Sequence, residues 1–128
     1  QEEFELTPIN AIHSSAIISP TAKISTGVMI GANVSINALA TIGNGTICNT
    51  GCIIEHECNI GNFAHIAPSA VCAGNVTIGD LSFVGANSVI KQGVIIGANV
   101  TIGAGTVVIK DIPDNTTVVG NPQRIIRK

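Results

Sequence analysis

The fold is decided by a repeat that is plainest in residues 30–66, which read IGANVS INALAT IGNGTI CNTGCI IEHECN IGNFAH I. Every sixth residue of this stretch is Ile or Cys, and the rule, with Val also allowed, holds at all seventeen positions from Ile12 to Val108. A period of six fits neither an α-helix nor one long strand. It is typical of short stacked repeats that share one core.

A second set of positions follows the same period. Two residues before each large apolar residue, from Ala16 to Thr106, the chain has only Ala, Val, Thr, Ser or Cys. Residues i and i+2 of an extended segment face the same side, so each hexad offers one large and one small inward side chain. Nine hexads continue with Gly or Asn, which tolerate the positive φ of a corner. The pattern predicts an all-β stack of short strands around a narrow aliphatic interior.

Composition narrows the possible partners. The 128 residues carry a net charge of -2, and only 2% are aromatic. A weakly acidic chain of this kind makes nucleic acid an unfavourable partner. It has no apolar run long enough to cross a bilayer, so we expect no membrane contact by this domain. The length suits one domain.

The four cysteines fall on inward positions of the repeat. Cys48 and Cys72 occupy large slots, whereas Cys52 and Cys58 occupy small ones. Buried cysteine behaves as a small hydrophobe, and the spacing matches no zinc pattern of the CxxC kind. We therefore expect packing thiols, no metal, and the reducing environment of the cytoplasm.

The two ends of the chain depart from the repeat. Because the first residue is Gln1 and the only methionine is Met29, we expect residues 1–11 to be a linker or the remnant of a preceding domain. Asp114 stands where the next large apolar residue is due, so we expect a β-helix domain over residues 12–111 and a C-terminal cap and tail over 112–128. The last nineteen residues hold four basic side chains, which could meet phosphates or simply solvate the tail: Lys110, Arg124, Arg127 and Lys128.

One corner carries ionisable residues that packing does not require. Glu55, His56 and Glu57 follow one another where other corners have Gly, Asn or Ala. A neighbouring carboxylate favours imidazolium, which makes the ring a stronger proton acceptor near neutral pH. The corner thus predicts a general base at His56; the alternative is a solvated histidine with incidental acidic neighbours.

Five motifs are distributed over nearly the whole chain. They are Ile12 to Ile17, Glu55-His56-Glu57-Cys58-x-Ile60-Gly61, His65, Gly74-Asn75-Val76-x-Ile78-Gly79, and Val118 to Pro122. Together they resemble the hexapeptide-repeat, left-handed β-helix sugar acetyltransferases. The sequence is most similar to the branch that N-acetylates UDP-4-amino-sugars in bacillosamine-type pathways of glycan biosynthesis and protein glycosylation, with sialic acid O-acetyltransferases as near relatives.

The resemblance implies a fold, an assembly and a reaction. Three hexads would form one triangular coil of eighteen residues, giving five to six coils of a left-handed parallel β-helix. The family is trimeric with sites between subunits, so we expect a homotrimer. Acetyl would pass directly from acetyl-CoA to the amine of a UDP-4-amino-4,6-dideoxy-N-acetylhexosamine. In this branch a small α/β domain, missing from these residues, binds the nucleotide.

The resemblance also implies roles for individual residues. His56 would take the proton from the amine, and Glu57 would orient His56 and raise its basicity. Asn49 and Glu55 would support this cluster. The expected acetyl-CoA contacts are His65, beside the thioester, and Gly74, Ala86 and Ala104.

A coil of eighteen residues places some of these positions on shared edges. Pro68, Ala86 and Ala104 would stack on one edge as a smooth track for the pantetheine arm, although corners prefer small residues in any case. His56 would fall on another edge with Gly74 and Gln92. A neighbouring subunit would then be needed to bring the two edges together.

Three other readings remain open. The same histidine chemistry would serve an O-acetyltransferase acting on a sugar or serine hydroxyl. A γ-type carbonic anhydrase needs three zinc-bound histidines, and the only histidines here are His13, His56 and His65. A structural or ice-binding β-helix would have a flat Thr-rich face or no polar cluster, which disagrees with the Glu-His-Glu corner.

Overall fold

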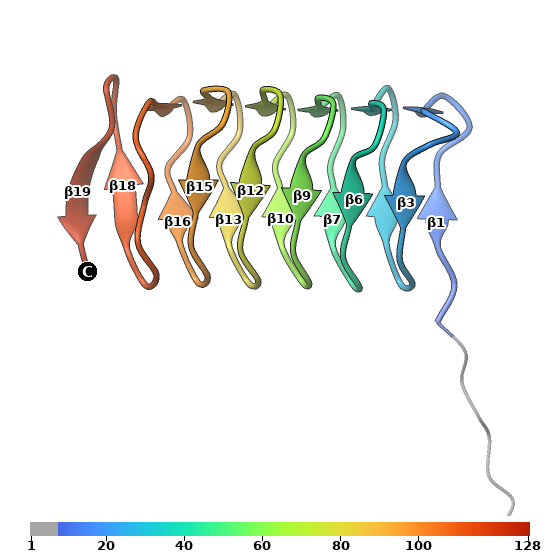
Figure 1. Ribbon diagram of the computed structural model, residues 1–128, viewed down its shortest axis with the longest axis horizontal. Helices are drawn as coiled ribbons and strands as arrows, with labels where there is room; N and C mark the ends of the chain where they lie inside the picture. Colours follow the sequence, from blue (N-terminus) through green and yellow to red (C-terminus); the bar gives the residue numbers. More distant parts are fainter. Residues whose placement is uncertain (1–7) are drawn as a thin grey trace, which may run out of the picture.

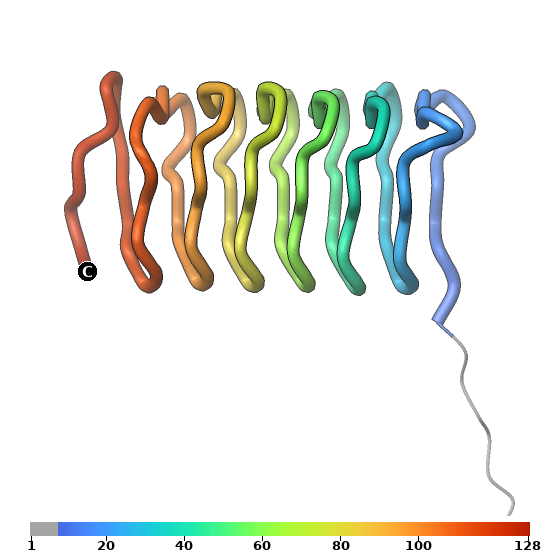
Figure 2. Tube along the Cα trace, viewed as in Figure 1, coloured from blue at the N-terminus to red at the C-terminus, as the bar shows by residue number. Residues whose placement is uncertain are grey.

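Two-residue strands recur every six residues along most of the chain, each followed by a turn, as the hexad pattern predicts. The computed structural model describes residues 8–128. Their seventeen short strands wind into a rod of stacked triangular coils (Figure 1), and the chain advances along the rod from one end to the other (Figure 2). No helix that could cross a membrane occurs in this part of the chain.

From β1 to β17 every third strand joins the same parallel sheet, which gives the rod three faces, and β18 and β19 extend the first of these sheets. Sheet A contains β1 (Ala11–Ile12), β4 (Met29–Ile30), β7 (Ile47–Cys48), β10 (His65–Ile66), β13 (Phe83–Val84), β16 (Thr101–Ile102), β18 (Thr117–Val119) and β19 (Arg124–Arg127). Sheet B contains β2 (Ile17–Ile18), β5 (Ser35–Ile36), β8 (Ile53–Ile54), β11 (Val71–Cys72), β14 (Val89–Ile90) and β17 (Val107–Val108). Sheet C contains β3 (Lys23–Ile24), β6 (Thr41–Ile42), β9 (Asn59–Ile60), β12 (Thr77–Ile78) and β15 (Ile95–Ile96).

The register of these sheets repeats every eighteen residues. His65 pairs with Ile47 on one side and with Phe83 on the other. Backbone N–H groups accordingly donate to the following coil, as from His65 N to Ser82 O at 2.9 Å. The prediction of an all-β, parallel β-helix domain of five to six coils is confirmed, and the arrangement is consistent with the left-handed sense.

The interior holds the residues that the period selects. Ile36, Ile54 and Ile66 are at most 1% exposed, whereas Ile12, at the N-terminal end of the stack, is 46% exposed. Buried hydroxyls occupy some small slots and join adjacent coils: Ser82 Oγ donates to Gly97 O at 2.7 Å and accepts from Val100 N at 2.9 Å. Within residues 8–128, no buried side-chain polar atom lacks a hydrogen-bond partner.

All four cysteines are buried free thiols, as their positions in the repeat predict. A hydrogen bond with Cys52, together with burial, raises the pKa of the Cys48 thiol well above its ordinary value. Burial raises the pKa of Cys72 in the same way. These thiols are therefore neutral packing groups at physiological pH, and thiolate chemistry at Cys48 or Cys72 is disfavoured.

The last coil is two residues shorter than the others. Ile112, 3% exposed, bridges Ile96 and fills the slot that strict sixfold spacing assigns to Asp114. Asp114 instead lies at a corner, where its Oδ1 accepts from Ala98 N at 2.8 Å. The hexad register is lost as predicted, yet the coil closes with β18, and β19 pairs antiparallel along the free edge of β18. An edge strand covered in this way is protected from pairing with other chains.

Alkaline pH should weaken the fold through the buried thiols. Folding raises the pKa of Cys72, so its stabilising effect is complete below the unfolded-state pKa of about 8.5 and declines as pH rises from there towards the folded value. We expect the urea midpoint to fall between pH 8 and pH 10, and to fall less in Cys72→Val. The same pH dependence in both proteins would contradict this account.

Candidate functional site

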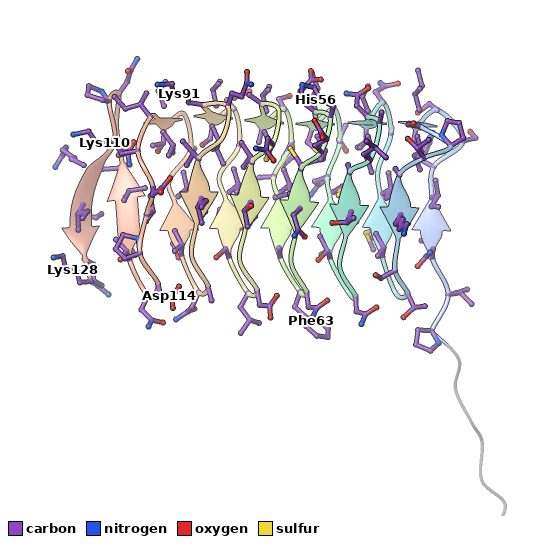
Figure 3. All side chains as sticks on the ribbon, in the orientation of Figure 1. His56, Phe63, Lys91, Lys110, Asp114 and Lys128 are labelled. Atoms are coloured by element: carbon purple, nitrogen blue, oxygen red, sulfur yellow. The ribbon has the colours of Figure 1, made fainter. Side chains whose placement is uncertain are left out.

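The three edges of the rod are lines of turns between sheets. The first edge, between sheets A and B, carries Pro68, Ala86 and Ala104, and Gly105 N donates to Ala86 O at 2.8 Å. The second edge, between sheets B and C, carries His56 and Gly74 in adjacent coils. The third edge, between sheets C and A, carries Asn44, Asn62, Asp80, Ala98 and Asp114. Figure 3 shows His56 on one long side of the rod and Asp114 on the opposite side.

His56 is an outward side chain on the second edge, in the turn between β8 and β9. Its Nδ1 lies 3.1 Å from Glu57 Oε1, and the two side chains are 52% and 56% exposed. A carboxylate can only accept, so Nδ1 carries the proton and Nε2 of the neutral ring is the free acceptor. Glu57 itself has a φ of 61°, a conformation that costs a non-glycine residue about 1–2 kcal/mol. The turn thus holds the carboxylate beside the ring at some cost in backbone strain.

Gly74 lies directly under the His56 ring, one coil further along the second edge. A Cβ added at Gly74 would lie 2.5 Å from His56 Nε2 and 2.6 Å from its Cε1. Gly74 does not have a left-handed φ. The glycine is therefore required by the position of the ring rather than by the backbone.

Glu55 belongs to the same turn but has a different partner. Asn37 Nδ2, one coil earlier, donates to Glu55 Oε1 at 3.1 Å. The only ion pair found in the described part of the chain joins His56 to Glu57. The structure therefore assigns Glu55 a contact between coils and Glu57 the contact with His56.

His65 lies on the outer face of sheet A, near the first edge. Asn49 Oδ1 accepts from Thr50 N at 2.7 Å, which turns Asn49 Nδ2 towards His65 Nε2 at 3.3 Å. Because that amide nitrogen can only donate, His65 Nε2 accepts and Nδ1 carries the proton. Phe83 packs edge-on against the ring, with centroids 5.2 Å apart. His65 is thus a fixed hydrogen-bond donor on an apolar wall.

The predicted site residues form two groups within one chain. His56, Glu57 and Gly74 lie together on the second edge, whereas Asn49 contacts His65 near the first edge rather than supporting His56. Sequence reasoning missed Phe83, although its spacing of eighteen from His65 is the signal that would have found it. It also missed Asn37, eighteen residues before Glu55.

Backbone amides distinguish the first edge from the third. On the third edge, Asn62 and Asp80 side chains accept from the amides one coil earlier: Asn44 N donates to Asn62 Oδ1 and Asn62 N to Asp80 Oδ1, both at 2.8 Å. On the first edge, the amides of Ala86 and Ala104 have no hydrogen-bond partner among residues 8–128. Since the next coil offers no polar side chain at Ala104, the Ala86 amide is available to a ligand.

No three His, Cys, Asp or Glu side chains of the described residues are grouped so that they could hold a metal ion. The three histidines are distributed along the rod. His13 directly follows β1 of sheet A, His65 lies in β10 of the same sheet, and His56 lies on the second edge.

Comparison with known proteins agrees with this fold. Residues 75–110 match the family described as bacterial transferase hexapeptide (six repeats). The fold matches GDP-perosamine N-acetyl transferase from Caulobacter crescentus, solved in complex with CoA and GDP-perosamine and with one histidine replaced by alanine. That match covers 95% of this chain and 58% of the other, at 38% identity and a TM-score of 0.94.

Two further solved structures are similar along most of the chain. The acetyltransferase domain of PglB from Neisseria gonorrhoeae FA1090, in complex with acetyl coenzyme A, is 37% identical over 94% of this chain and 58% of its own, with a TM-score of 0.93. WeeI from Acinetobacter baumannii AYE is 32% identical over 90% and 57%, with a TM-score of 0.87. The chain thus spans less than two thirds of each of these proteins. Its resemblance to the hexapeptide-repeat sugar acetyltransferases is confirmed.

Proposed function

We propose that this chain is the acetyl-transfer domain of an acetyl-CoA-dependent N-acetyltransferase whose acceptor is the amine of a nucleotide-linked 4-amino-sugar. The observation that carries the proposal is His56, whose Nδ1 is held by Glu57 at 3.1 Å while Nε2 stays free above Gly74. The similar structures with CoA, acetyl-CoA and GDP-perosamine support it. They favour an amine acceptor over a hydroxyl, and leave UDP and GDP sugars both as candidates.

The proton path follows from the His56–Glu57 pair. The amine nitrogen attacks the thioester carbonyl carbon while Nε2 of His56 accepts the proton that the nitrogen loses. The carbon–sulfur bond then breaks, and the proton passes from His56 to the departing CoA thiolate. Glu57 stabilises the imidazolium that exists between the two transfers. The products are the acetylated amine and free CoA, so no acyl-enzyme is needed.

His65 suits the other half of the reaction. Negative charge develops on the thioester oxygen during attack, and a fixed N–H donor stabilises it most when solvent reorganisation is avoided. Asn49 fixes Nδ1 of His65 as that donor, and Phe83 restricts the ring. The acetyl group of acetyl-CoA would lie beside His65, and the pantetheine arm would follow the unpartnered backbone amides of Ala86 and Ala104.

A closed trimer would unite these groups. For the first edge of one copy to meet the second edge of the next around a threefold axis, the face between those edges must point to the axis. That face is the outer side of sheet B, whose outward residues are aliphatic except at Ser35: Ile17, Ile53, Val71, Val89 and Val107. Sheet C instead has the polar side chains Lys23, Thr41, Asn59 and Thr77, and a single aliphatic one, Ile95. We therefore propose that sheet B forms the trimer interface, a cyclic arrangement common among oligomers.

Removal of the proposed base should stop acetyl transfer. His56→Ala is expected to lower kcat by at least about a hundredfold, because an unassisted amine must lose its proton to water. Release of CoA thiol would be followed with acetyl-CoA and either a UDP-4-amino-sugar or GDP-perosamine. Lys23→Gln, on the outer face of sheet C, leaves the second edge unchanged and serves as the fold control. A wild-type rate in His56→Ala would remove this residue from the mechanism.

A methyl group at Gly74 should act through the His56 ring. Gly74→Ala adds only a Cβ in contact with Nε2 of His56, so we expect at least a tenfold lower kcat and an unchanged melting temperature. Gln92→Ala, one coil further along the same edge, is the matched control. In a His56→Ala background, Gly74→Ala should have no further effect; a second loss of activity there would mean that Gly74 acts independently of His56.

The proposed trimer predicts the mass of the assembly and a position at which substitution should dissociate it. Light scattering should report three times the chain mass of 13.0 kDa. Val89→Glu puts a charge on the outer face of sheet B, where Val89 is 43% exposed in the single chain, and should dissociate the trimer and reduce activity. Asn59→Glu on sheet C should do neither. A monomeric wild-type protein with full activity would disprove an interfacial site.

A further inference from the structure

A shallow hollow lies on the outer side of sheet A at its N-terminal end, away from both histidines of the proposed reaction. It has a volume of about 410 Å³ and is lined by Ala11, Ile12, His13, Met29, Ile30 and Gly31. Met29 remains 52% exposed although it is large and apolar. The hollow is therefore a mainly apolar surface with one polar ring, His13, at its side.

The hollow is continuous with the proposed reaction site through one row of outward residues. Met29 pairs with Ile47, and Ile47 pairs with His65. Two strand spacings, about 10 Å in total, separate the Met29 position from His65. The proposed cofactor track through Ala86 and Ala104 leaves His65 in the opposite, C-terminal direction. A second substrate can therefore reach the thioester from the side where the hollow lies without crossing the cofactor.

His13 presents a defined hydrogen-bond donor to this approach. Its Nδ1 accepts from Ser15 N at 3.0 Å and lies 2.9 Å from Ser15 Oγ, which itself accepts from Asn33 N at 2.8 Å. An imidazole nitrogen that accepts from a backbone N–H has no proton, so the proton of the neutral ring is on Nε2. Ser15 thus fixes both the orientation of the ring and the identity of its free donor.

Resting on the function proposed above, we propose that this hollow binds the sugar diphosphate portion of the acceptor. His13 Nε2–H donates to a phosphate oxygen, and Met29 packs against the apolar face of the sugar ring. A hexose carries its 4-amine and its anomeric diphosphate on opposite sides of the ring, so the amine can face His65 while the phosphates extend towards His13. Phosphate oxygens are strong acceptors for such a donor.

The experiment measures steady-state kinetics with two acceptors, an intact nucleotide-linked 4-amino-sugar such as GDP-perosamine and the corresponding free amino-sugar. For the intact acceptor, His13→Ala and Met29→Gln should each raise KM about tenfold, while kcat and the KM for acetyl-CoA stay within twofold. For the free sugar, His13→Ala should change nothing, because the phosphate is absent, whereas Met29→Gln should still raise KM.

Ile95→Gln is the matched control, because Ile95 is 53% exposed but lies on sheet C. An unchanged KM for the intact acceptor in both variants would overturn the proposal. If the wild-type protein acetylates no amino-sugar, the proposed function fails. Calorimetric titration of GDP-perosamine into the CoA-loaded protein then tests binding at the hollow independently of catalysis. Equal binding to wild type and His13→Ala, or no binding to either, would overturn it; weaker binding to His13→Ala would support it.

Discussion

The hydrogen bonds between successive coils are the constraint on which the whole molecule depends. A strand of two residues has no stability by itself, and its backbone groups are satisfied only by the coils before and after it. Bonds such as Asn49 N to Ile66 O, 2.8 Å, recur along the rod. Each coil is therefore built on the preceding one, and residues eighteen apart share one position around the axis. The outward side chains occupy a regular grid with a spacing of about 4.8 Å along the axis.

This grid explains how so simple a fold can carry a chemical site. The interior accepts only one large and one small side chain per hexad, so few residue types are tolerated at the inward positions. Outward positions are free of that demand, and residues placed on them keep a defined distance from those in neighbouring coils. His56 above Gly74, and His65 between Ile47 and Phe83, are examples in which the position of one side chain is set by a residue one coil away.

Most of the fold could be predicted from the sequence because the packing rule is local and repeats without interruption. The rule failed where the chain shortened a turn: Ile112 took the slot assigned to Asp114, and a period alone does not reveal a two-residue deletion. The identity of His56 and Glu57 as a pair was predictable from their adjacency. The contact of Asn49 with His65 was not predictable, because it depends on the side-chain orientation of Asn49, which the hydrogen bond from Thr50 N sets, rather than on spacing. The contact between Gly74 and His56 likewise depends on the ring conformation.

The unpartnered amides of the first edge show why the third edge of the rod is not an equivalent ligand track. The backbone repeats almost identically at every edge, so the edges present equivalent N–H groups, and on the third edge Asn and Asp side chains accept hydrogen bonds from several of them. The two edges thus differ in which N–H groups their side chains leave available. Replacing Ala104 with Asn would remove one binding group from the track, and the reverse change on the third edge would create one. Evolution can lengthen, shorten or move a track of this kind one coil at a time without altering the core.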